Sequence, residues 1–337
     1  MLTHTVLIVD DTVENIDVLK GILCDEYHLK VATNGRMAIK VAQKTMPDII
    51  LMDIMMPGMD GYETCARLKS NPLTQNIPVI FVTTKNQDMD EARGFEVGAV
   101  DYITKPVSPI ITKVRIKTQI ALKNQNAELE KLVVNRTSEL TETRLEIIKR
   151  LCIAAEYKDN DTGLHIERVS KYAYYIAKSY GLEESYAQIL TNSVPMHDIG
   201  KIGVPEEILH KPGKLTDDEF EIIKTHCNIG AEIIGEHSSD LLKAARIVSL
   251  QHHEKWNGTG YPNFLAGESI HIYARITAVA DVFDALTSKR PYKEAWTNED
   301  ALNYIIMQSG QHFDPKVVEA FQHSISDIYW VKNSLND

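Results

Sequence analysis

The residues with the clearest capacity for chemistry are histidines and aspartates in the C-terminal half of the chain. Ten of the twelve histidines lie beyond residue 160. The adjacent pairs His197-Asp198 and His252-His253 accompany a single histidine, His226, in the segment IKTHCNIG. Imidazole and carboxylate donors together suit Mn, Fe, Ni or Zn better than Ca or Mg. Because these donors are too many for one ion, we expect two metal ions that share a bridging carboxylate and can bind a phosphodiester beside an activated water.

Two further pairs stand at helical spacing in the same half of the chain. Asp161 and His165 are four residues apart, so on a helix they share one face. Asp281 precedes Asp284 by three residues in TAVADVFDAL, which also places both on one face. A lone histidine or an HD dipeptide is weak evidence for a metal site, so the prediction depends on the whole set.

A separate acidic group lies at the ends of apolar runs in the N-terminal part. Asp10 and Asp11 follow the run LIV, and Asp53 follows the run IILM. Sites in open α/β sheets form where the carboxyl ends of parallel strands meet. Carboxylates with water suit Mg²⁺, and Lys105, which follows another short apolar run, can neutralise the remaining negative charge. We therefore expect a magnesium site at this edge.

The elements that must position these residues differ between the two halves. The N-terminal part alternates short apolar runs with amphipathic stretches, which predicts a parallel sheet covered by helices on both faces. Beyond Leu151 helical patterns dominate and predict an all-α domain. The predicted strands cover residues 6–9, 29–32, 49–52, 79–83 and 101–103, and the predicted helices of the N-terminal part cover 13–23, 38–43, 62–69 and 88–96.

A long helix is predicted between the two parts. No glycine or proline occurs between Ile110 and Asp161, and leucines recur at helical intervals among charged residues. Two interpretations stay open: contact with a second copy as a coiled coil, or packing on its own domain. The predicted boundaries are 1–122 for the first domain, 109–150 for the linking helix and 145–337 for the second domain.

Bulk composition limits the classes of function. The chain has 337 residues, more than one compact core usually holds. Its net charge of −11 gives no indication of a DNA-binding face. Its four cysteines are scattered and form no CxxC pair, which indicates reduced thiols. Since no signal peptide or transmembrane run is evident, we expect a cytoplasmic protein without membrane insertion.

The N-terminal motifs resemble a known domain family. LIVDD, IILMDIMMPGMDG, VIFVTT and DYITKP, in this order, are similar to the receiver domain of two-component response regulators over about residues 4–122. The resemblance implies a flavodoxin-like, doubly wound α/β fold in which Asp53 accepts a phosphoryl group from a partner histidine kinase. It implies Mg²⁺ ligands from the carboxylates of Asp10, Asp11 and Asp53 and the carbonyl of Met55. It assigns the response to phosphorylation to Thr83, Tyr102 and Lys105.

The C-terminal motifs resemble the HD-GYP family of phosphodiesterases. HDIGKIGVPEEILHKPGKLTDDEF, IKTHCNIGAEII, HHEKWNGTGYP and ARITAVADVFDALTSKRPYKEAW carry the resemblance, which runs from about Leu145 to Phe321. It implies an all-α domain of the HD superfamily that hydrolyses cyclic di-GMP to pGpG, with further cleavage to GMP left open. The implied metal ligands are His165, His197, Asp198, His226, His252, His253 and Asp281. The implied catalytic residues are Asp198, which bridges the ions, and Lys201, and the implied substrate contacts are Lys201, Tyr261, Asp284, Arg290 and Lys293.

Three positions depart from the HD-GYP pattern. Asp161 stands where some members have a glutamate that can hold a third metal, and the shorter side chain favours two metals. Phe264 and His271 stand where glycine and proline are common, so they bear on loop shape and substrate affinity. The histidines that match no ligand position are interpreted as surface or packing residues: His210, His237, His271, His312 and His323.

Cofactors and partners follow from both resemblances. We expect two transition metals in the second domain, Fe or Mn ahead of Ni or Zn. The expected partners are a sensor histidine kinase, cyclic di-GMP, diguanylate cyclases and a second copy bound through the linking helix. Phosphorylation of Asp53 would control access to the metal site through that helix. The alternatives are a non-catalytic adaptor that binds cyclic di-GMP, which a broken ligand set would favour, and a phosphodiesterase for another cyclic dinucleotide.

Overall fold

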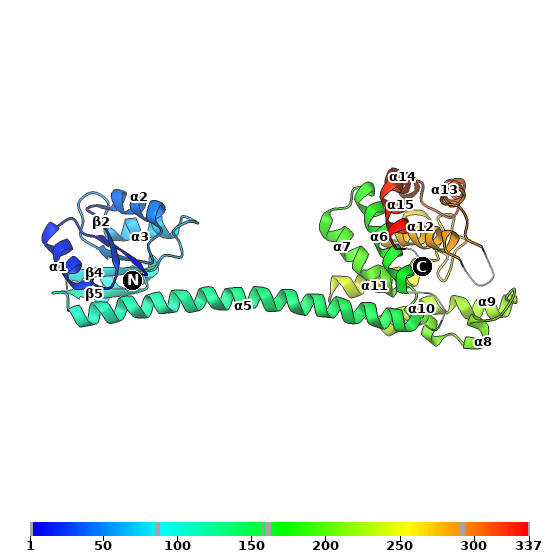
Figure 1. The fold of residues 1–337 in the computed structure, drawn as a ribbon, viewed down its shortest axis with the longest axis horizontal. Coiled ribbons are helices and arrows are strands. Elements are labelled where there is room, and N and C mark those ends of the chain that lie inside the picture. Colours follow the sequence, from blue (N-terminus) through cyan, green and yellow to red (C-terminus); the bar gives the residue numbers. More distant parts are fainter. Residues whose placement is uncertain (1–2, 85–87, 157, 159–162, 290–293, 336–337) are drawn as a thin grey trace. The chain divides into compact units, whose positions relative to one another are not determined.

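A computed structural model of the chain describes residues 3–84, 88–156, 158, 163–289 and 294–335, without the side chains of residues 88–91 (Figure 1). The chain divides into two compact units, residues 1–137 and 138–337. Each unit has its own core and is described by itself.

The first unit is a five-stranded parallel sheet in the order β2-β1-β3-β4-β5. Its strands are β1 (Thr5–Val9), β2 (His28–Ala32), β3 (Ile49–Asp53), β4 (Val79–Thr84) and β5 (Asp101–Lys105). Its helices are α1 (Val13–Leu23), α2 (Gly35–Thr45), α3 (Gly61–Lys69), α4 (Asp88–Glu96) and the first part of α5 (Pro109–Glu156). The strand order reverses beside β1, so the carboxyl ends of β1 and β3 open onto a crevice. The predicted α/β fold is confirmed.

Alternate residues of the central strands serve opposite faces of this sheet. Leu7 and Met52 face a core that α2 and α3 complete, whereas Ile8 and Leu51 face a core that α1 and the start of α5 complete. Every residue of β3 is buried, as expected for a strand with helices on both sides. Burial on both faces of the sheet therefore explains why these strands appear in the sequence as unbroken apolar runs.

The second unit contains helices joined by loops and, among its described residues, no strand beyond one isolated bridge between Ser309 and Phe313. Its helices are α6 (Gly163–Tyr180), α7 (Glu184–Ser193), α8 (Glu206–Leu209), α9 (Asp217–Lys224), α10 (His226–Ile234), α11 (Asp240–Gln251), α12 (Ile272–Thr287), α13 (Asn298–Met307), α14 (Pro315–His323) and α15 (Ile325–Ser334), with short 3₁₀ turns η2 (Val194–Met196), η3 (Ile199–Gly203) and η4 (Gly267–Ser269). Tyr172, Phe283 and Phe321 from α6, α12 and α14 meet in the core. The predicted all-α domain is confirmed.

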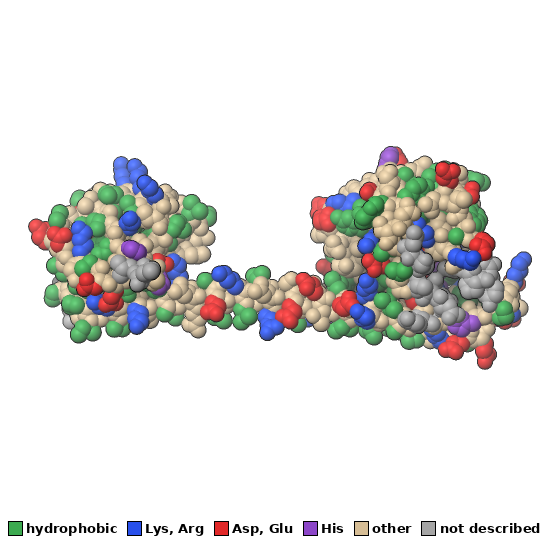
Figure 2. Space-filling model, viewed as in Figure 1, with side chains coloured by type: hydrophobic (Ala, Val, Ile, Leu, Met, Phe, Trp, Pro, Cys, Tyr) green, Lys and Arg blue, Asp and Glu red, His purple; other side chains and the backbone are tan. Residues whose placement is uncertain are grey.

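Helix α5 begins at Pro109 as expected and continues to Glu156, beyond the predicted end at residue 150. Ile116 and Ile120 contribute to the core of the first unit, and Cys152 contributes to a cluster in the second. The middle of the helix exposes apolar side chains among acidic and basic ones (Figure 2). These exposed residues are Leu122, Leu129, Leu132, Val133, Val134, Leu140, Ile147 and Leu151. Within the described residues, neither this helix nor any other is apolar enough over sufficient length to span a bilayer.

Candidate metal centre and phosphoacceptor site

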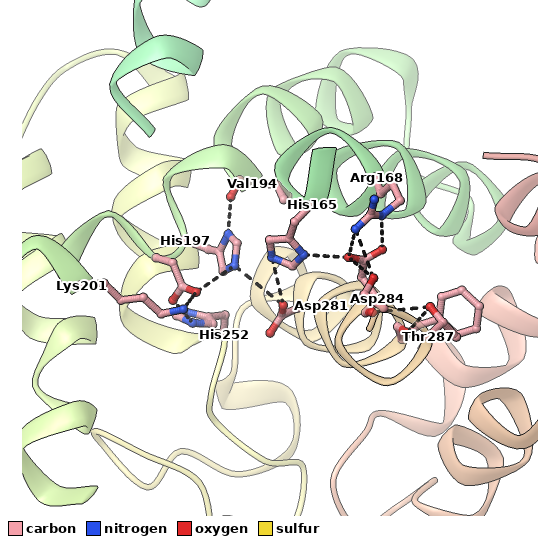
Figure 3. A network of polar contacts seen from close by, with 12 residues as sticks. His165, Arg168, Val194, His197, Lys201, His252, Asp281, Asp284 and Thr287 are labelled. Atoms are coloured by element: carbon pink, nitrogen blue, oxygen red, sulfur yellow. Dashed lines mark hydrogen bonds and ion pairs between the residues drawn. The ribbon is translucent and has the colours of Figure 1, made fainter. Parts of the chain in front are cut away.

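All seven predicted metal ligands of the second unit fall into two neighbouring groups of donors. One group contains Asp198, His226, His252 and His253, and the other contains His165, His197 and Asp281. Within each group, one donor atom per residue lies within 4.8 Å of the others. Five different segments contribute: α6, the turn between η2 and η3, the start of α10, the residues after α11, and α12. Figure 3 shows His165, His197, His252 and Asp281 from four of them. Tertiary packing therefore brings together residues that are more than one hundred positions apart.

The carboxylate of Asp198 lies between the two groups. Its Oδ1 is 3.3 Å from Nε2 of His226 and 3.4 Å from Nε2 of His252, and its Oδ2 is 3.4 Å from Nε2 of His197. Lys201 Nζ contacts the same Oδ2 at 2.7 Å. In the other group, Oδ1 of Asp281 lies 3.6 Å from Nε2 of His165. One oxygen of Asp198 thus faces each group, as a bridging carboxylate requires.

A glycine permits this approach of the HD segment to α10. A Cβ atom on Gly200 would lie 1.9 Å from the carbonyl oxygen of His226 and 2.5 Å from the backbone nitrogen of Gly230. No side chain can occupy that space, because both neighbours are backbone atoms. Gly200 therefore allows η3, with Asp198 just before it, to pack directly against the helix that carries His226.

The histidine rings are held by their Nδ1 atoms. Nδ1 of His197 lies 2.9 Å from the carbonyl of Val194, and Nδ1 of His226 lies 2.6 Å from the carbonyl of Ile223. His252 contacts the carbonyl of Val248 in the same way, at 3.0 Å. Since a carbonyl only accepts hydrogen bonds, each Nδ1 carries a proton, so the neutral form of each ring presents its lone pair at Nε2. This arrangement is typical of histidines that bind metals through Nε2.

Without a metal ion, protonated histidines balance the charge of the buried carboxylates in the site. Burial raises the pKa of Asp198, but Lys201 and His197 outweigh this effect and hold the pKa well below its usual value. Burial lowers the pKa of His165 and of His226, yet their carboxylate partners Asp284 and Asp198 raise the values to about 9 and about 10. The carboxylates therefore stay ionised at neutral pH, and protons on the histidines supply the compensating positive charge.

The residues fit a pair of transition metal ions. Nε2 of His197 and Oδ1 of Asp198 are buried and form no hydrogen bond within the described part of the chain. Buried polar atoms that lack a hydrogen bond are costly, and a bound cation would satisfy both of these atoms. Nitrogen donors dominate, with carboxylate oxygen from Asp198 and Asp281, which favours first-row transition metals over Ca²⁺ or Mg²⁺.

The loop that carries Gly260-Tyr261-Pro262 lies beside these ligands. The ring of Tyr261 is 4.8 Å from that of His253, and Phe220 of α9 packs on its other side at 6.1 Å. Glu254, which is 2 % exposed, accepts hydrogen bonds from the backbone N–H groups of Asn263 and Leu265 at 2.7 and 3.0 Å. The site therefore includes a loop that a buried carboxylate holds in place.

The two departures in and after this loop have visible consequences. Phe264 adopts a φ of 55°, in the left-handed region that favours glycine, and the residue is 69 % exposed. His271 precedes α12, and its side chain accepts a hydrogen bond from the backbone N–H of Tyr273 at 3.2 Å. Neither residue belongs to a group of metal donors in the described residues.

Asp284 lies deeper than a substrate contact would require. Its side chain is 1 % exposed. Its oxygens accept hydrogen bonds from Nδ1 of His165 at 2.8 Å and from the guanidinium of Arg168 at 2.7 and 2.9 Å. The structure places Asp284 behind His165, a predicted metal ligand, because packing of α6 on α12 buries this side of α12.

The acidic group of the first unit lies at the crevice of the sheet. One carboxylate oxygen from each of Asp10, Asp11 and Asp53 falls within a mutual distance of 4.8 Å. Lys105 Nζ reaches Oδ2 of Asp10 at 2.9 Å and Oδ1 of Asp53 at 3.2 Å. Burial raises the pKa of Asp53, and Lys105 opposes that effect. Two buried carboxylates beside one lysine and the exposed Asp11 leave excess negative charge that suits a divalent cation.

The remaining predicted residues of this unit lie on β4, on β5 and just after β3. Thr83 lies near the end of β4, and its hydroxyl donates to the carbonyl of Thr84 at 3.2 Å. Tyr102 on β5 is half-buried, with its ring 6.4 Å from Phe95. Met55 follows Asp53, the last residue of β3, by two positions and is 77 % exposed. All the predicted receiver residues are thus at the carboxyl edge of the sheet or adjacent to it.

The remaining predicted positions lie outside the described residues or outside the groups of metal donors. Asp161, Arg290 and Lys293 lie outside the described residues. The five histidines that were interpreted as surface or packing residues belong to no donor group among the residues that the structure describes: His210, His237, His271, His312 and His323.

The sequence reasoning missed two residues that support the site, Glu254 and Arg168. Glu254 directly follows the His252-His253 pair, and Arg168 lies three positions after His165. A charged residue on the buried side of an amphipathic helix is unusual, and this signal could have identified Arg168.

Two family models match the chain. One, described as "HD domain", covers residues 130–317, and the other, described as "Response regulator receiver domain", covers residues 6–117. A Vibrio cholerae protein described as "Probable cyclic di-GMP phosphodiesterase" is 40% identical over 94% of this chain and 77% of its own length. The "Cyclic di-GMP phosphodiesterase response regulator RpfG" of Xanthomonas campestris is 38% identical over 94% of this chain and 86% of its own length. A second Vibrio cholerae protein, "3'3'-cGAMP-specific phosphodiesterase 2", is 43% identical over 60% of this chain and 39% of its own length.

Proposed function

The chain belongs to the response regulators that join a receiver domain to an HD domain, and we propose that it hydrolyses cyclic di-GMP under the control of phosphorylation at Asp53. The protein is a metal-dependent phosphodiesterase. The position of the Asp198 carboxylate between two groups of metal donors, with Lys201 against it, is the observation that carries this proposal.

Each part of the site has a distinct task. Two bound transition metals, Fe or Mn in our proposal, would supply Lewis acidity and lower the pKa of a water molecule. His165, His197 and Asp281 would hold one ion, His226, His252 and His253 would hold the other, and Asp198 would contribute a carboxylate oxygen to each. Lys201 is 18 % exposed on its side chain, so its ammonium group can bind a phosphate oxygen of the substrate and stabilise negative charge that develops there.

The neighbouring loop recognises the nucleotide. Tyr261 packs edge-on against Phe220 and beside His253, which leaves an aromatic wall next to the metal donors. Glu254 fixes the backbone of that loop and so keeps Tyr261 in register with the ligands. Arg290 and Lys293 complete the substrate contacts in this proposal, through cationic groups that suit phosphate oxygens.

A different cyclic dinucleotide is the second candidate substrate. One relative is described as specific for 3'3'-cGAMP and matches 60% of this chain, and no described residue of the site selects guanine on both bases. Side-by-side turnover of cyclic di-GMP, 3'3'-cGAMP and cyclic di-AMP decides between them. If kcat/KM is higher for 3'3'-cGAMP or for cyclic di-AMP, that dinucleotide is the substrate in place of cyclic di-GMP.

The receiver domain accepts the phosphoryl group in this proposal. A partner histidine kinase would donate it to Asp53, and Asp10, Asp11, Asp53 and the carbonyl of Met55 would hold the Mg²⁺ that offsets the negative charge of the phosphoryl group. Asp53 is 6 % exposed and faces Lys105, so the added charge and acceptor oxygens change the surroundings of Thr83 and Tyr102.

Helix α5 transmits the change and pairs two copies of the chain. Leu122, Leu129, Val133, Leu140 and Ile147 are each at least 46 % exposed. Their separations of seven and four residues are close to the coiled-coil repeat. A parallel or antiparallel partner helix would cover this apolar stripe and link the state of the receiver to the metal site.

The direct experiment measures hydrolysis of cyclic di-GMP by protein purified without oxygen, with metal content determined on the same sample. We expect turnover with about two transition metals per chain. A double variant, His197→Ala with Asp198→Ala, removes ligands of both groups and should abolish turnover. His323→Ala is the matched control, because this histidine is exposed and lies in no donor group of the described residues.

The possible failures separate the alternatives. Full metal occupancy without turnover of any cyclic dinucleotide would favour a non-catalytic adaptor that binds the nucleotide or a diguanylate cyclase. Equal turnover by the wild type and Asp53→Asn after treatment with a phosphodonor would show that phosphorylation does not control the enzyme.

A further inference from the structure

A buried arginine lies one helical turn after the metal ligand His165. Arg168 is 1 % exposed, although a guanidinium is always charged and its burial is costly without partners. Its Nε and Nη2 atoms donate to Oδ1 and Oδ2 of Asp284 at 2.7 and 2.9 Å. Two parallel hydrogen bonds of this kind fix both the position and the plane of the carboxylate.

The same carboxylate holds His165. Oδ2 of Asp284 accepts the hydrogen bond from Nδ1 of His165 at 2.8 Å, which leaves Nε2 facing Asp281 at 3.6 Å (Figure 3). In His197, His226 and His252, by contrast, Nδ1 contacts a backbone carbonyl of the same segment of the chain. His165 instead depends on a side chain from another helix, and that side chain depends on Arg168.

The C-terminal helix completes the chain of contacts. Nη1 of Arg168 donates to the carbonyl of Leu335 at 3.1 Å, just after α15 ends. Nη2 also donates to Ser288 Oγ at 3.1 Å, and Lys332 of α15 donates to the same hydroxyl at 2.9 Å. The end of α15 thus lies two hydrogen bonds from Asp284 and three from His165.

We propose that Arg168 is a positioning residue for metal binding: through Asp284 it sets the orientation of His165, and the end of α15 holds Arg168 in place. The inference rests on the proposed two-metal function and assigns to that function residues that do not touch the metals or the substrate. Groups that orient metal-bound histidines typically change metal affinity about 10- to 100-fold when removed. The effect is confined to the ion bound by His165, His197 and Asp281, because His226 and His252 have separate Nδ1 partners.

A second buried ion pair in the same unit provides a matched control. Arg275 donates to Asp314 at 2.5 Å, with side-chain exposures of 12 % and 1 %. Asp314 caps the start of α14 through the N–H of Lys316 at 2.9 Å. This pair supports the fold and contacts none of the predicted ligands. Arg275→Lys therefore shows how much Mn²⁺ binding and thermal stability change when a buried ion pair away from the ligands is weakened.

The test is titration of the metal-free full-length chain with Mn²⁺, in competition with a chromophoric chelator, together with thermal unfolding of the metal-free protein. The step that His165→Ala removes identifies the ion in question. We expect Arg168→Lys to weaken that step about 10- to 100-fold and to leave the other step within threefold of the wild type. Arg275→Lys should leave both steps unchanged.

A milder variant covers the case in which Arg168→Lys does not fold. Ser288→Ala removes one hydroxyl that contacts both Arg168 and Asp284, and we expect a smaller shift of the same step. Unchanged Mn²⁺ binding in a folded Arg168→Lys protein, or in Ser288→Ala where Arg168→Lys is unfolded, overturns the proposal. Equal weakening of both steps also overturns it, because the role would then be general stability. The wild-type titration tests the two-metal function by itself, and only the variants test the role of Arg168.

Discussion

Replacement of Gly200 by alanine tests whether the close packing of the HD segment on α10 organises the metal centre. A Cβ atom there would lie 1.9 Å from the carbonyl oxygen of His226 and 2.5 Å from the backbone nitrogen of Gly230. Real Cβ contacts are rarely shorter than 3.0 Å, so η3 and α10 must separate by roughly 1 Å, a displacement large enough to disturb a catalytic arrangement. The contact is between backbones, so no rotamer change can relieve it.

The displacement acts on both sides of the bridging carboxylate. Asp198 immediately precedes η3, Lys201 lies within it, and His226 begins α10. Over-packing of this kind typically costs about 1–3 kcal/mol of stability. A misplacement of about 1 Å can cost about 100-fold in rate. We therefore expect Gly200→Ala to fold, with turnover of cyclic di-GMP reduced by about two orders of magnitude and weaker metal binding.

Gly21→Ala is the matched control. This glycine lies inside α1, and a Cβ atom there would meet nothing within 4 Å. Alanine in a helix is favoured over glycine by about 0.5–1 kcal/mol, so this control should be slightly more stable and equally active. Turnover and metal content are measured with chemical unfolding of each protein. Wild-type turnover and metal binding in Gly200→Ala would refute the argument from packing.

Two further predictions concern charge and the nucleotide loop. In the metal-free protein the pKa values of His165 and His226 are about 9 and about 10, so both rings are protonated at pH 7 and must lose those protons to bind metal. Calorimetry of metal binding in buffers of different ionisation enthalpy should show release of about two protons at pH 7. The metal affinity should rise with pH and level off near the pKa values of the two histidines in the folded protein. A binding enthalpy that does not depend on the buffer would contradict this prediction. Glu254→Gln turns one buried acceptor into a donor opposite a backbone N–H, so it should lower the free energy of unfolding by about 1–3 kcal/mol. The same change should raise KM more than it lowers kcat. An unchanged midpoint of chemical unfolding would show that the loop does not depend on this carboxylate.

Much of the fold could be predicted from the sequence because local pattern and burial agree there. The runs LIV and IILM are buried on both faces of the sheet, so their composition alone identified central strands. Helix α1 has the predicted bounds, Val13–Leu23. Helix α5 extends past its predicted end, and its last turns include Cys152, which is buried in a cluster with Ile166 and Met196 of the second unit.

The types and order of the candidate ligands were also evident in the sequence, since metal chemistry requires imidazole and carboxylate groups whatever the fold. The tertiary structure decided which atoms face one another. It turned both oxygens of Asp198 toward different histidine groups, because Gly200 lets two backbones meet. It placed Asp284 behind His165 and paired it with Arg168, whose charge is tolerated in the interior only because carboxylate and carbonyl oxygens surround it. Such pairing depends on helices distant in sequence, and no local pattern specifies it.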